Sequence, residues 1–117
     1  MRMTGLLSLS LVWVWLALPA VASEVHHCQE DAKERSEGLV RLHYTGSSSG
    51  EINNLFVDES VIVRPPVKSL VGNGYFDVLE TKAYVYRAQH RLRFIYAQLE
   101  DDCVLMGQEI LEVADPY

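Results

Sequence analysis

The residues most suited to chemistry stand together near the start of the chain, as His26-His27-Cys28. Two imidazoles and a sulfur are ligands that a borderline metal such as zinc accepts. A closed zinc site would need a further ligand from His43, His90 or a carboxylate, and no Cys-x-x-Cys or His-x-x-x-His spacing is present. We therefore favour a solvated linker here, keep metal binding by His26 and His27 as an alternative, and expect no cofactor.

Arginine and tyrosine recur in two strand-like runs near the C-terminus, 82–87 and 91–97. Both residue types are enriched in the hot spots of protein interfaces. If the two runs pair as a hairpin, the guanidinium groups gather near its tip beside tyrosine rings. The simpler alternative is that the arginines balance acidic neighbours on a solvated sheet face. The candidate binding residues are Arg87, Arg91, Arg93, Tyr84 and Tyr86, with Tyr96 further along the second run.

Catalysis finds little support in the residue types. No Gly-x-Ser-x-Gly elbow is present, and the serines at 47–49 lie in a flexible segment that would not hold a hydroxyl against a base. Cys103 could pair with a histidine, but a disulfide competes for its sulfur. Glu100-Asp101-Asp102 could bind calcium, yet it lacks an EF-hand pattern and is typical of a solvated turn. We predict that the protein is not an enzyme, and a small enzyme remains an alternative.

The chain has two cysteines, Cys28 and Cys103. In an oxidising compartment they allow a single pairing, which would close a loop of about 75 residues. Such a loop contributes about 4.5 kcal/mol in the chain-entropy model, against a total stability of about 5–15 kcal/mol for a small domain. The alternative is a pair of free thiols or metal ligands. We predict the disulfide.

Residues 1–22 have the composition of a secretory signal peptide. Arg2 precedes an uncharged, apolar run at 6–18, and Ala20-Val21-Ala22 gives the small-x-small pattern of a cleavage site before Ser23. The apolar run is shorter than the roughly 20 residues that cross a bilayer, so we favour cleavage over an uncleaved anchor. We predict an exported protein, periplasmic or extracellular, with no membrane span after cleavage.

Residues 23–117 are long enough for one domain, and we expect a single small exported domain. This part of the chain keeps nine basic and sixteen acidic residues, which gives it a net charge of −7. The acidity argues against a nucleic-acid partner, which calls for a basic surface, and it disfavours docking on anionic lipid. We expect a protein or envelope-polymer partner, and the sequence indicates no oligomeric state.

A short helix followed by a strand is expected after the histidines. Residues 29–37 are rich in helix formers, and Gly38 would end the helix. Residues 39–44 alternate between apolar and polar side chains as a strand does, and 46–50 is a loop rich in glycine and serine. The helix has a thin apolar face, so Cys28 at its start would tether it through the disulfide.

Strand-like segments make up the rest of the chain. In 91–97 every second residue is apolar and arginines start the other face, which is typical of a half-buried antiparallel strand. Proline cannot donate to a ladder, so Pro65 and Pro66 would end the strand at 60–64. A single helix over 79–99 is the rival, but its tyrosines and β-branched residues favour strands. The apolar face of 91–97 is formed by Leu92, Phe94 and Tyr96. Further strands are expected at 52–57, 75–79, 82–87 and 103–113.

These expectations give an α+β fold, with a short N-terminal helix packed on an antiparallel β-sheet of five or six strands. An all-β sandwich or small barrel is the alternative. For a small, exported, disulfide-bonded domain without a catalytic constellation, the best-fitting class is a non-catalytic binding, inhibitor or accessory protein of the cell envelope. A metal-binding protein and a small enzyme are the two other classes.

Overall fold

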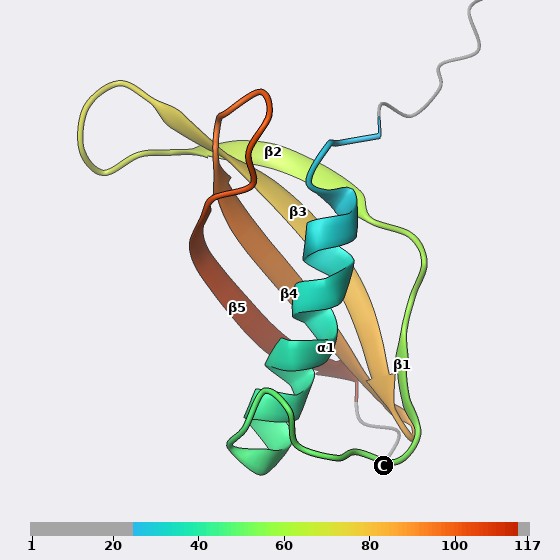
Figure 1. Ribbon diagram of the computed structural model, residues 1–117. Coiled ribbons are helices and arrows are strands. Elements are labelled where there is room, and N and C mark those ends of the chain that lie inside the picture. The colour runs from blue at the N-terminus through green and yellow to red at the C-terminus, as the bar shows by residue number, and fades with distance from the viewer. Residues whose placement is uncertain (1–24, 115–117) are drawn as a thin grey trace, which may run out of the picture.

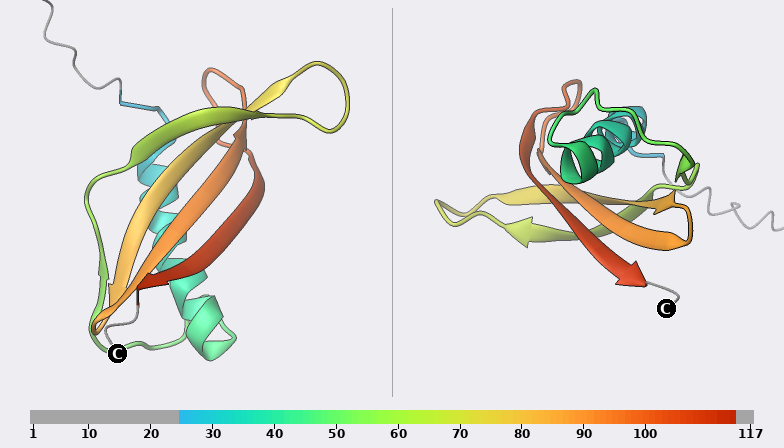
Figure 2. Two further views of the ribbon diagram at one scale, coloured as in Figure 1. Left: turned by 180° about the vertical axis from the view of Figure 1, so that it is seen from behind. Right: turned by 90° about the horizontal axis from the view of Figure 1, so that it is seen from below.

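The computed structural model describes residues 25–114, so the expected signal peptide at 1–22 lies outside the described residues. One helix and five strands follow one another along the described range (Figure 1). The helix lies against one face of an antiparallel sheet, which confirms the predicted α+β class (Figure 2). The elements are α1 (Gln29–Thr45), β1 (Leu55–Val57), β2 (Ile62–Lys68), β3 (Tyr75–Val85), β4 (Ala88–Ala97) and β5 (Leu105–Ala114).

Strand β3 is the centre of the sheet, because three other strands pair with it. β4 lies along one edge of β3, and β5 pairs with the far edge of β4. The opposite edge of β3 is shared, since β1 pairs with residues 83–85 and β2 pairs with residues 75–80. The strand order is therefore β1-β3-β4-β5, with β2 beside the other half of β3.

The helix is longer than predicted, and the prediction of a strand at 39–44 is wrong. α1 continues through Gly38 to Thr45. Its buried residues recur at intervals of three and four, so the second half of the helix completes the apolar face that the first turns leave thin. Gly46 ends the helix in the left-handed conformation, at φ 79°, and donates its N–H to the carbonyl of Leu42. The buried residues are Ala32, Ser36, Leu39 and Val40.

The prediction that Pro65 and Pro66 end a strand is also wrong, because β2 runs through both of them. The register between β2 and β3 shifts between Arg64 and Val67, so the prolines lie in a bulge of the ladder. β2 is also an edge strand beside β3, and an edge tolerates a residue that cannot donate a hydrogen bond. The bulge explains how the chain continues as a strand beyond the prolines.

The predicted pairing of the two runs near the C-terminus is confirmed, but residues 88–90, which were expected to separate them, belong to β4. Residues 75–79 and 82–87, expected as separate segments, belong largely to one strand, β3, which returns as β4 after a turn at Tyr86-Arg87. Tyr86 has φ 55°, in the left-handed region that tight hairpin turns use. A tyrosine in this conformation costs about 1–2 kcal/mol in backbone strain, which a glycine would avoid.

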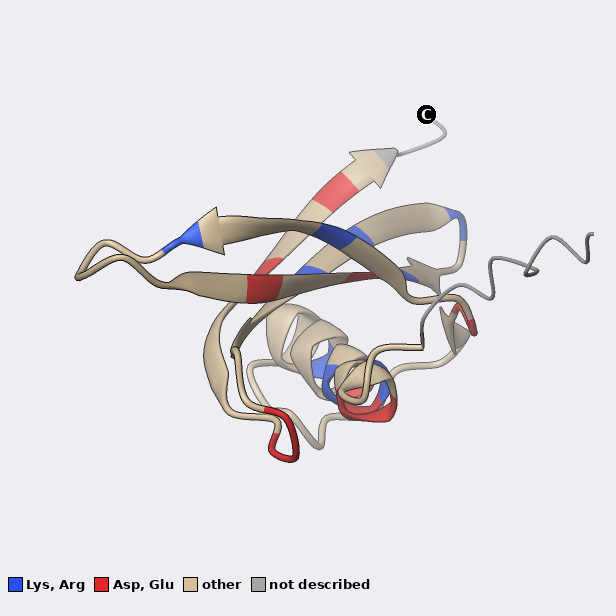
Figure 3. Cartoon of the chain, turned by 90° about the horizontal axis from the view of Figure 1, so that it is seen from above, with Lys and Arg blue, Asp and Glu red and all other residues tan. Residues whose placement is uncertain are grey.

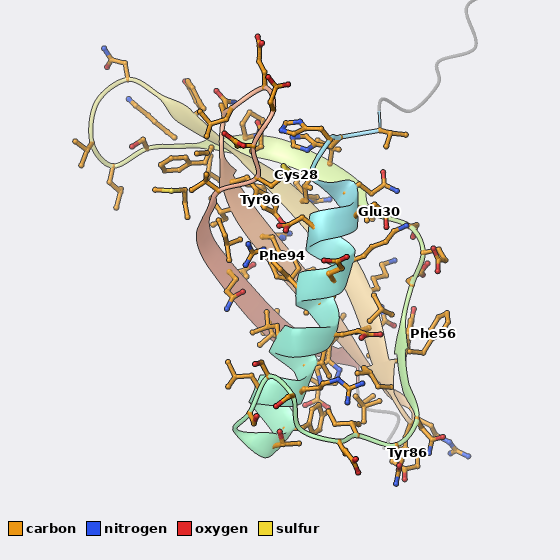
Figure 4. All side chains as sticks on the ribbon, in the orientation of Figure 1. Cys28, Glu30, Phe56, Tyr86, Phe94 and Tyr96 are labelled. Atoms are coloured by element: carbon orange, nitrogen blue, oxygen red, sulfur yellow. A yellow bond between two sulfur atoms is a disulfide. The ribbon has the colours of Figure 1, made fainter. Side chains whose placement is uncertain are left out.

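The core lies between α1 and the face of β3 and β4 that the helix covers. Figure 4 shows Phe94 and Tyr96 between the helix and the sheet, and the alternation predicted for 91–97 is confirmed. Polar groups also meet here, since Ser36 Oγ lies 2.6 Å from Thr81 Oγ1 and both residues are buried. The buried apolar side chains of the two strands include Leu79, Ala83, Leu92, Phe94 and Tyr96.

The predicted disulfide is confirmed. Cys28 and Cys103 are bonded, with their Cα atoms 5.6 Å apart. Cys28 is fully buried immediately before α1, and Cys103 lies between β4 and β5. The bond therefore ties the start of the helix to the segment that enters the last strand. Among the described residues, no helix is long and apolar enough to cross a bilayer.

Candidate functional site

The sheet face away from α1 carries charged side chains that stand opposite one another on neighbouring strands. Glu80 of β3 is opposite Arg93 of β4, and Lys82 is opposite Arg91. Residues directly opposite in an antiparallel pair point to the same face, and these residues alternate with the buried core positions. Figure 3 shows basic positions along the strands, and acidic positions on β3 and β5, on α1 and in the loop before β5.

Glu80 is the centre of this charge cluster. Its side chain is only 7 % exposed, although it lies on the face away from the helix. Arg93 donates its Nε–H to Glu80 Oε1 at 2.9 Å, and Arg91 Nε and Arg64 Nε lie 3.7 and 3.9 Å from the same oxygen. Arg93 Nε also lies 3.8 Å from Glu109 Oε1 on β5. One buried carboxylate thus gathers guanidinium groups from β2 and β4.

The cluster carries more positive than negative charge, with three arginines against the two carboxylates of Glu80 and Glu109. Arg91 Nε is buried and has no hydrogen-bond partner among the described residues, so the cluster holds an unused donor. The local charge keeps its sign on an acidic protein, because physiological salt largely screens charges more than about 8 Å away. We use the name arginine face for Arg64, Lys82, Arg91 and Arg93 together with Glu80 and Glu109.

An aromatic pair borders the arginine face. Phe56 of β1 lies opposite Tyr84 of β3, and their ring centroids are 6.2 Å apart. Phe56 is 59 % exposed, and Figure 4 shows it pointing away from the helix. Aromatic side chains and arginine are enriched in the central, well-packed parts of protein interfaces. The open face of the sheet therefore offers an apolar anchor next to its charged groups.

The structure divides the predicted binding residues between two places. Arg91, Arg93 and Tyr84 lie on the open face of the sheet, away from α1. Arg87 and Tyr86 form the hairpin turn, where Tyr86 is 71 % exposed and points away from the domain (Figure 4). Arg91 and Arg93 lie in the middle of β4 rather than beside the turn, so the arginines do not form one group at the hairpin tip.

Tyr96 lies on the face that the helix covers and belongs to the core. Its hydroxyl donates to Asp31 Oδ2 at 2.8 Å, and Arg35 Nε donates to the same oxygen at 2.6 Å. Burial, followed by the hydrogen bond to Asp31, raises the pKa of Tyr96 well above its ordinary value. The alternation that turns the arginines of β4 outward therefore turns Tyr96 inward, and it takes no part in the open face.

Glu80 and Arg64 are members of the arginine face that the sequence analysis missed. Glu80 and Lys82 stand at every second position of β3, and this spacing was the available signal that they share a face. Arg64 reaches the cluster because it pairs with Val78, and that register depends on the bulge at the prolines. The expected end of the strand at Pro65 concealed the bulge, and with it the neighbour of Glu80.

The histidine pair lies beside the start of α1, next to β3. His26 Nδ1 accepts the N–H of Cys28 at 3.0 Å, which leaves Nε2 as the protonated nitrogen, and Nε2 lies 2.9 Å from Asp77 Oδ2. Both ring nitrogens of His26 are thus in use. Burial opposes ionisation of Asp77, but hydrogen bonds from His26 and Gln98 outweigh it, and the pKa of this carboxyl is lowered.

Metal binding at the same cluster would require rearrangement. The donor atoms of His26, His27 and Cys28 lie within 4.8 Å of one another, but the sulfur of Cys28 is in the disulfide. His27 Nε2 donates to the carbonyl of Asp102 at 3.2 Å, so only its Nδ1 keeps a lone pair for a metal. Zinc takes three or four protein ligands. A cavity of about 420 Å³ lies beside the pair, lined by His26, His27, Asp77, Gln98, Leu99 and Glu100.

A second histidine cluster lies between the end of α1 and the sheet. His90 is fully buried, and its Nε2 lies 2.9 Å from the hydroxyl of Tyr44. Its Nδ1 has no hydrogen-bond partner among the described residues. The ring of His43 is 6.0 Å away, and Glu112 is opposite His90 on β5. Burial lowers the pKa of His90 although Glu112 opposes the shift, so the imidazole is neutral at pH 7.

Comparison with protein-family models, curated proteins and solved structures gave no match. The function must therefore be inferred from the residues of this chain. The histidine pair has its donors engaged within the protein, whereas the arginine face combines excess cations, an unused buried donor and an exposed aromatic pair. The open face of the sheet is therefore the best-supported candidate site.

Proposed function

We propose that the protein is an exported, non-catalytic binding protein of the cell envelope whose arginine face recognises an acidic segment of a protein partner. The observation that carries this proposal is the grouping of Arg64, Arg91 and Arg93 around the single buried carboxylate of Glu80. Each guanidinium has five N–H donors, so one carboxylate leaves most of them for other acceptors. Carboxylates of a partner are the acceptors that match them best.

Glu80 also prepares the arginines for binding by holding them close to one position. An arginine side chain carries about 2 kcal/mol of rotamer entropy, and part of that cost is removed when the side chain is ordered before the partner arrives. Arg91 and Arg93 stand on the same face of one strand, about 7 Å apart along it. An extended segment with acidic residues at every second position has the same repeat, and Phe56 with Tyr84 would pack against its apolar residues.

Export is the part of the proposal that rests on residues 1–22 and on the disulfide. The signal-like sequence and a bond that forms in oxidising compartments both support a periplasmic or extracellular location. Intact-mass measurement of exported material should find a chain that begins at Ser23 or within a residue or two of it. Exported protein that keeps residues 1–22 would contradict a released binding protein.

Residues 23–117 contain every described helix and strand and the disulfide, so this chain can serve as bait. It should capture a partner from an envelope extract and should bind a Glu-Ser-Glu-Ser-Glu peptide more weakly as salt rises. The test variant combines Arg91→Gln and Arg93→Gln with Glu80→Gln. The third change is needed because a buried carboxylate without its arginines would cost about 3–5 kcal/mol and could unfold the domain.

We expect the triple variant to lose partner capture and to bind the peptide about tenfold more weakly, while its circular dichroism spectrum stays unchanged. A matched control, Lys33→Gln with Arg41→Gln, removes two cations from α1 on the other side of the sheet and should bind normally. If the control loses the partner and the triple variant keeps it, the contact surface lies on the helix. If the arginines are needed to capture a polymer and not a protein, the proposal of a protein partner is wrong.

A further inference from the structure

The loop between β2 and β3, residues 69–74, projects from one end of the sheet away from the helix (Figures 1 and 2). Leu70 at its tip is fully exposed, and Val71 is 85 % exposed. Val67 and Tyr75 at the base of the loop are exposed as well. We use the name tip loop for residues 69–74. A group of apolar side chains at the end of a projecting hairpin indicates a contact with something outside the domain.

The tip loop is held in shape by its own hydrogen bonds. Ser69 Oγ donates to the carbonyl of Val71 at 2.8 Å and accepts the N–H of Val71 at 3.2 Å. The backbone N–H of Ser69 donates to the carbonyl of Gly74 at 2.8 Å, and Gly72 adopts φ 81°. These bonds satisfy backbone groups within the loop, which lowers the cost of moving the tip from water into an apolar medium.

The part of this hairpin that carries the tip loop is basic, whereas the whole domain is acidic. Residues 60–76 contain Arg64 and Lys68 but no aspartate or glutamate, whereas residues 23–117 carry a net charge of −7. Apolar side chains at a tip with basic residues behind them match the order of layers in a bilayer surface, where acyl chains lie beneath anionic headgroups.

We propose that the tip loop inserts Leu70 and Val71 into the surface of a bilayer that contains anionic phospholipid. A specific protein interface takes about 800 Å² from each partner, more than two residues on a narrow turn provide. Shallow insertion needs only a few apolar side chains and one or two cations, and it gives weak, reversible attachment. The inserted residues, Leu70 and Val71, lie outside the arginine face, and of the two cations behind them Lys68 also lies outside it, whereas Arg64 belongs to it.

The acidity of the domain does not prevent such attachment. A six-residue loop extends about 10 Å from the last strand pair, since each extended residue spans about 3.3 Å. This reach is similar to the distance of about 8 Å over which physiological salt screens charges. The acidic body can therefore stay outside the range of the headgroups while the tip makes contact. The proposal therefore applies to this loop alone, and the acidity of the body still predicts that the body avoids anionic lipid.

A tryptophan at the tip tests the insertion directly. Both tryptophans of the chain, Trp13 and Trp15, lie within residues 1–22, so residues 23–117 have none. Leu70→Trp should show emission at shorter wavelength when vesicles of phosphatidylcholine with about one third phosphatidylglycerol are added. Leu99→Trp, on the loop after β4, is the matched control and should show no shift.

A second pair of variants measures what the apolar tip contributes. Leu70→Ser with Val71→Ser should reduce co-sedimentation with the same vesicles by about tenfold, because it removes the apolar area that drives insertion. Leu99→Ser with Val104→Ser removes the same number of exposed apolar side chains elsewhere and should leave co-sedimentation unchanged. The proposal is overturned if the tip variant still binds fully, if vesicles without phosphatidylglycerol bind equally well, or if Leu70 is needed to capture a protein instead.

Discussion

The hydroxyl of Tyr96 donates a hydrogen bond to Asp31, which joins the first turn of α1 to the end of β4 across 65 residues of sequence. Arg35 donates to the same carboxylate oxygen, so Asp31 remains paired if the tyrosine bond is lost. The contact is partly buried, where a bond to a charged acceptor contributes more than a bond between neutral groups. The position of the helix on the sheet therefore depends in part on one hydroxyl group.

Tyr96→Phe should lower the free energy of unfolding by about 1.5–3 kcal/mol, because it removes the donor to Asp31 and leaves the aromatic packing in place. Chemical denaturation monitored by circular dichroism measures the change. Tyr75→Phe is the matched control, since Tyr75 is half exposed at the end of β3 and should change stability by less than about 0.5 kcal/mol. If both substitutions lowered the free energy of unfolding equally, the hydrogen bond to Asp31 would make no contribution to stability.

Breaking the disulfide should destabilise the domain strongly. Cys103→Ser is expected to lower stability by about 2–4 kcal/mol and the melting temperature by several degrees. Cys28 is fully buried in the native domain, so the variant also leaves a thiol in the core. A thiol-reactive reagent should label neither cysteine in the unreduced native protein. Full labelling of both positions before reduction would show that the bond is absent in solution.

Stability should fall as the pH drops below about 6.5, the ordinary value for histidine, because His90 is buried in its neutral form. Its pKa is lower in the folded state than in the unfolded state. As the pH falls, the unfolded chain therefore takes up the proton first. Stability is lost until the pH reaches the lowered pKa of His90 in the native protein. His43 and Glu112 also face the imidazole. His90→Gln, which cannot titrate, should flatten the pH dependence of unfolding between about pH 7 and 5.

The same comparison with His43→Gln separates the two histidines of this cluster. His43 is exposed to solvent although its ring lies near His90, and its substitution should leave most of the pH dependence in place because burial is the main cause of the lowered pKa of His90. A pH profile that is unaffected by His90→Gln would show that other groups cause the acid sensitivity.

Relief of the strain at the hairpin turn should stabilise the protein. Tyr86 adopts φ 55° and is mostly exposed, so Tyr86→Asn loses little packing and gains a residue that accepts this conformation. We expect a gain of about 0.5–1 kcal/mol, measured by chemical denaturation. Arg87→Asn is the matched control, because Arg87 is not among the residues with positive φ and should show no gain. If Tyr86→Asn stabilises the fold but weakens partner capture, the strained tyrosine serves binding.

The strands that alternate cleanly were the part of the fold that sequence could predict. Leu92, Phe94 and Tyr96 fall on one face and the arginines of β4 on the other, because a strand has a strict period of two. The prediction of a strand at residues 39–44 was wrong for a related reason. Their alternation also fits a helical face when Ala32 and Ser36 are included, and burial against the sheet decides in favour of the helix.

The candidate site could be predicted only in part. Arg91 and Arg93 were identified from residue type, but Arg64 and Glu80 meet them only through strand register. That register is set by a bulge at two prolines, and local preferences treat prolines as the end of a strand. The exposure of Leu70 could not be predicted either, because it depends on the hairpin extending beyond the rest of the sheet.

The central position of β3 determines when the chain can fold. Among the described strands, β1 and β2 precede β3 in the sequence and pair with no other strand, and α1 also packs against it. A chain that leaves a ribosome or crosses a translocation pore from its N-terminus therefore has no sheet to join until β3 has followed. Until then, β1 and β2 lack the strand with which they pair. Assembly then becomes possible for all the preceding elements together, once a single late strand arrives.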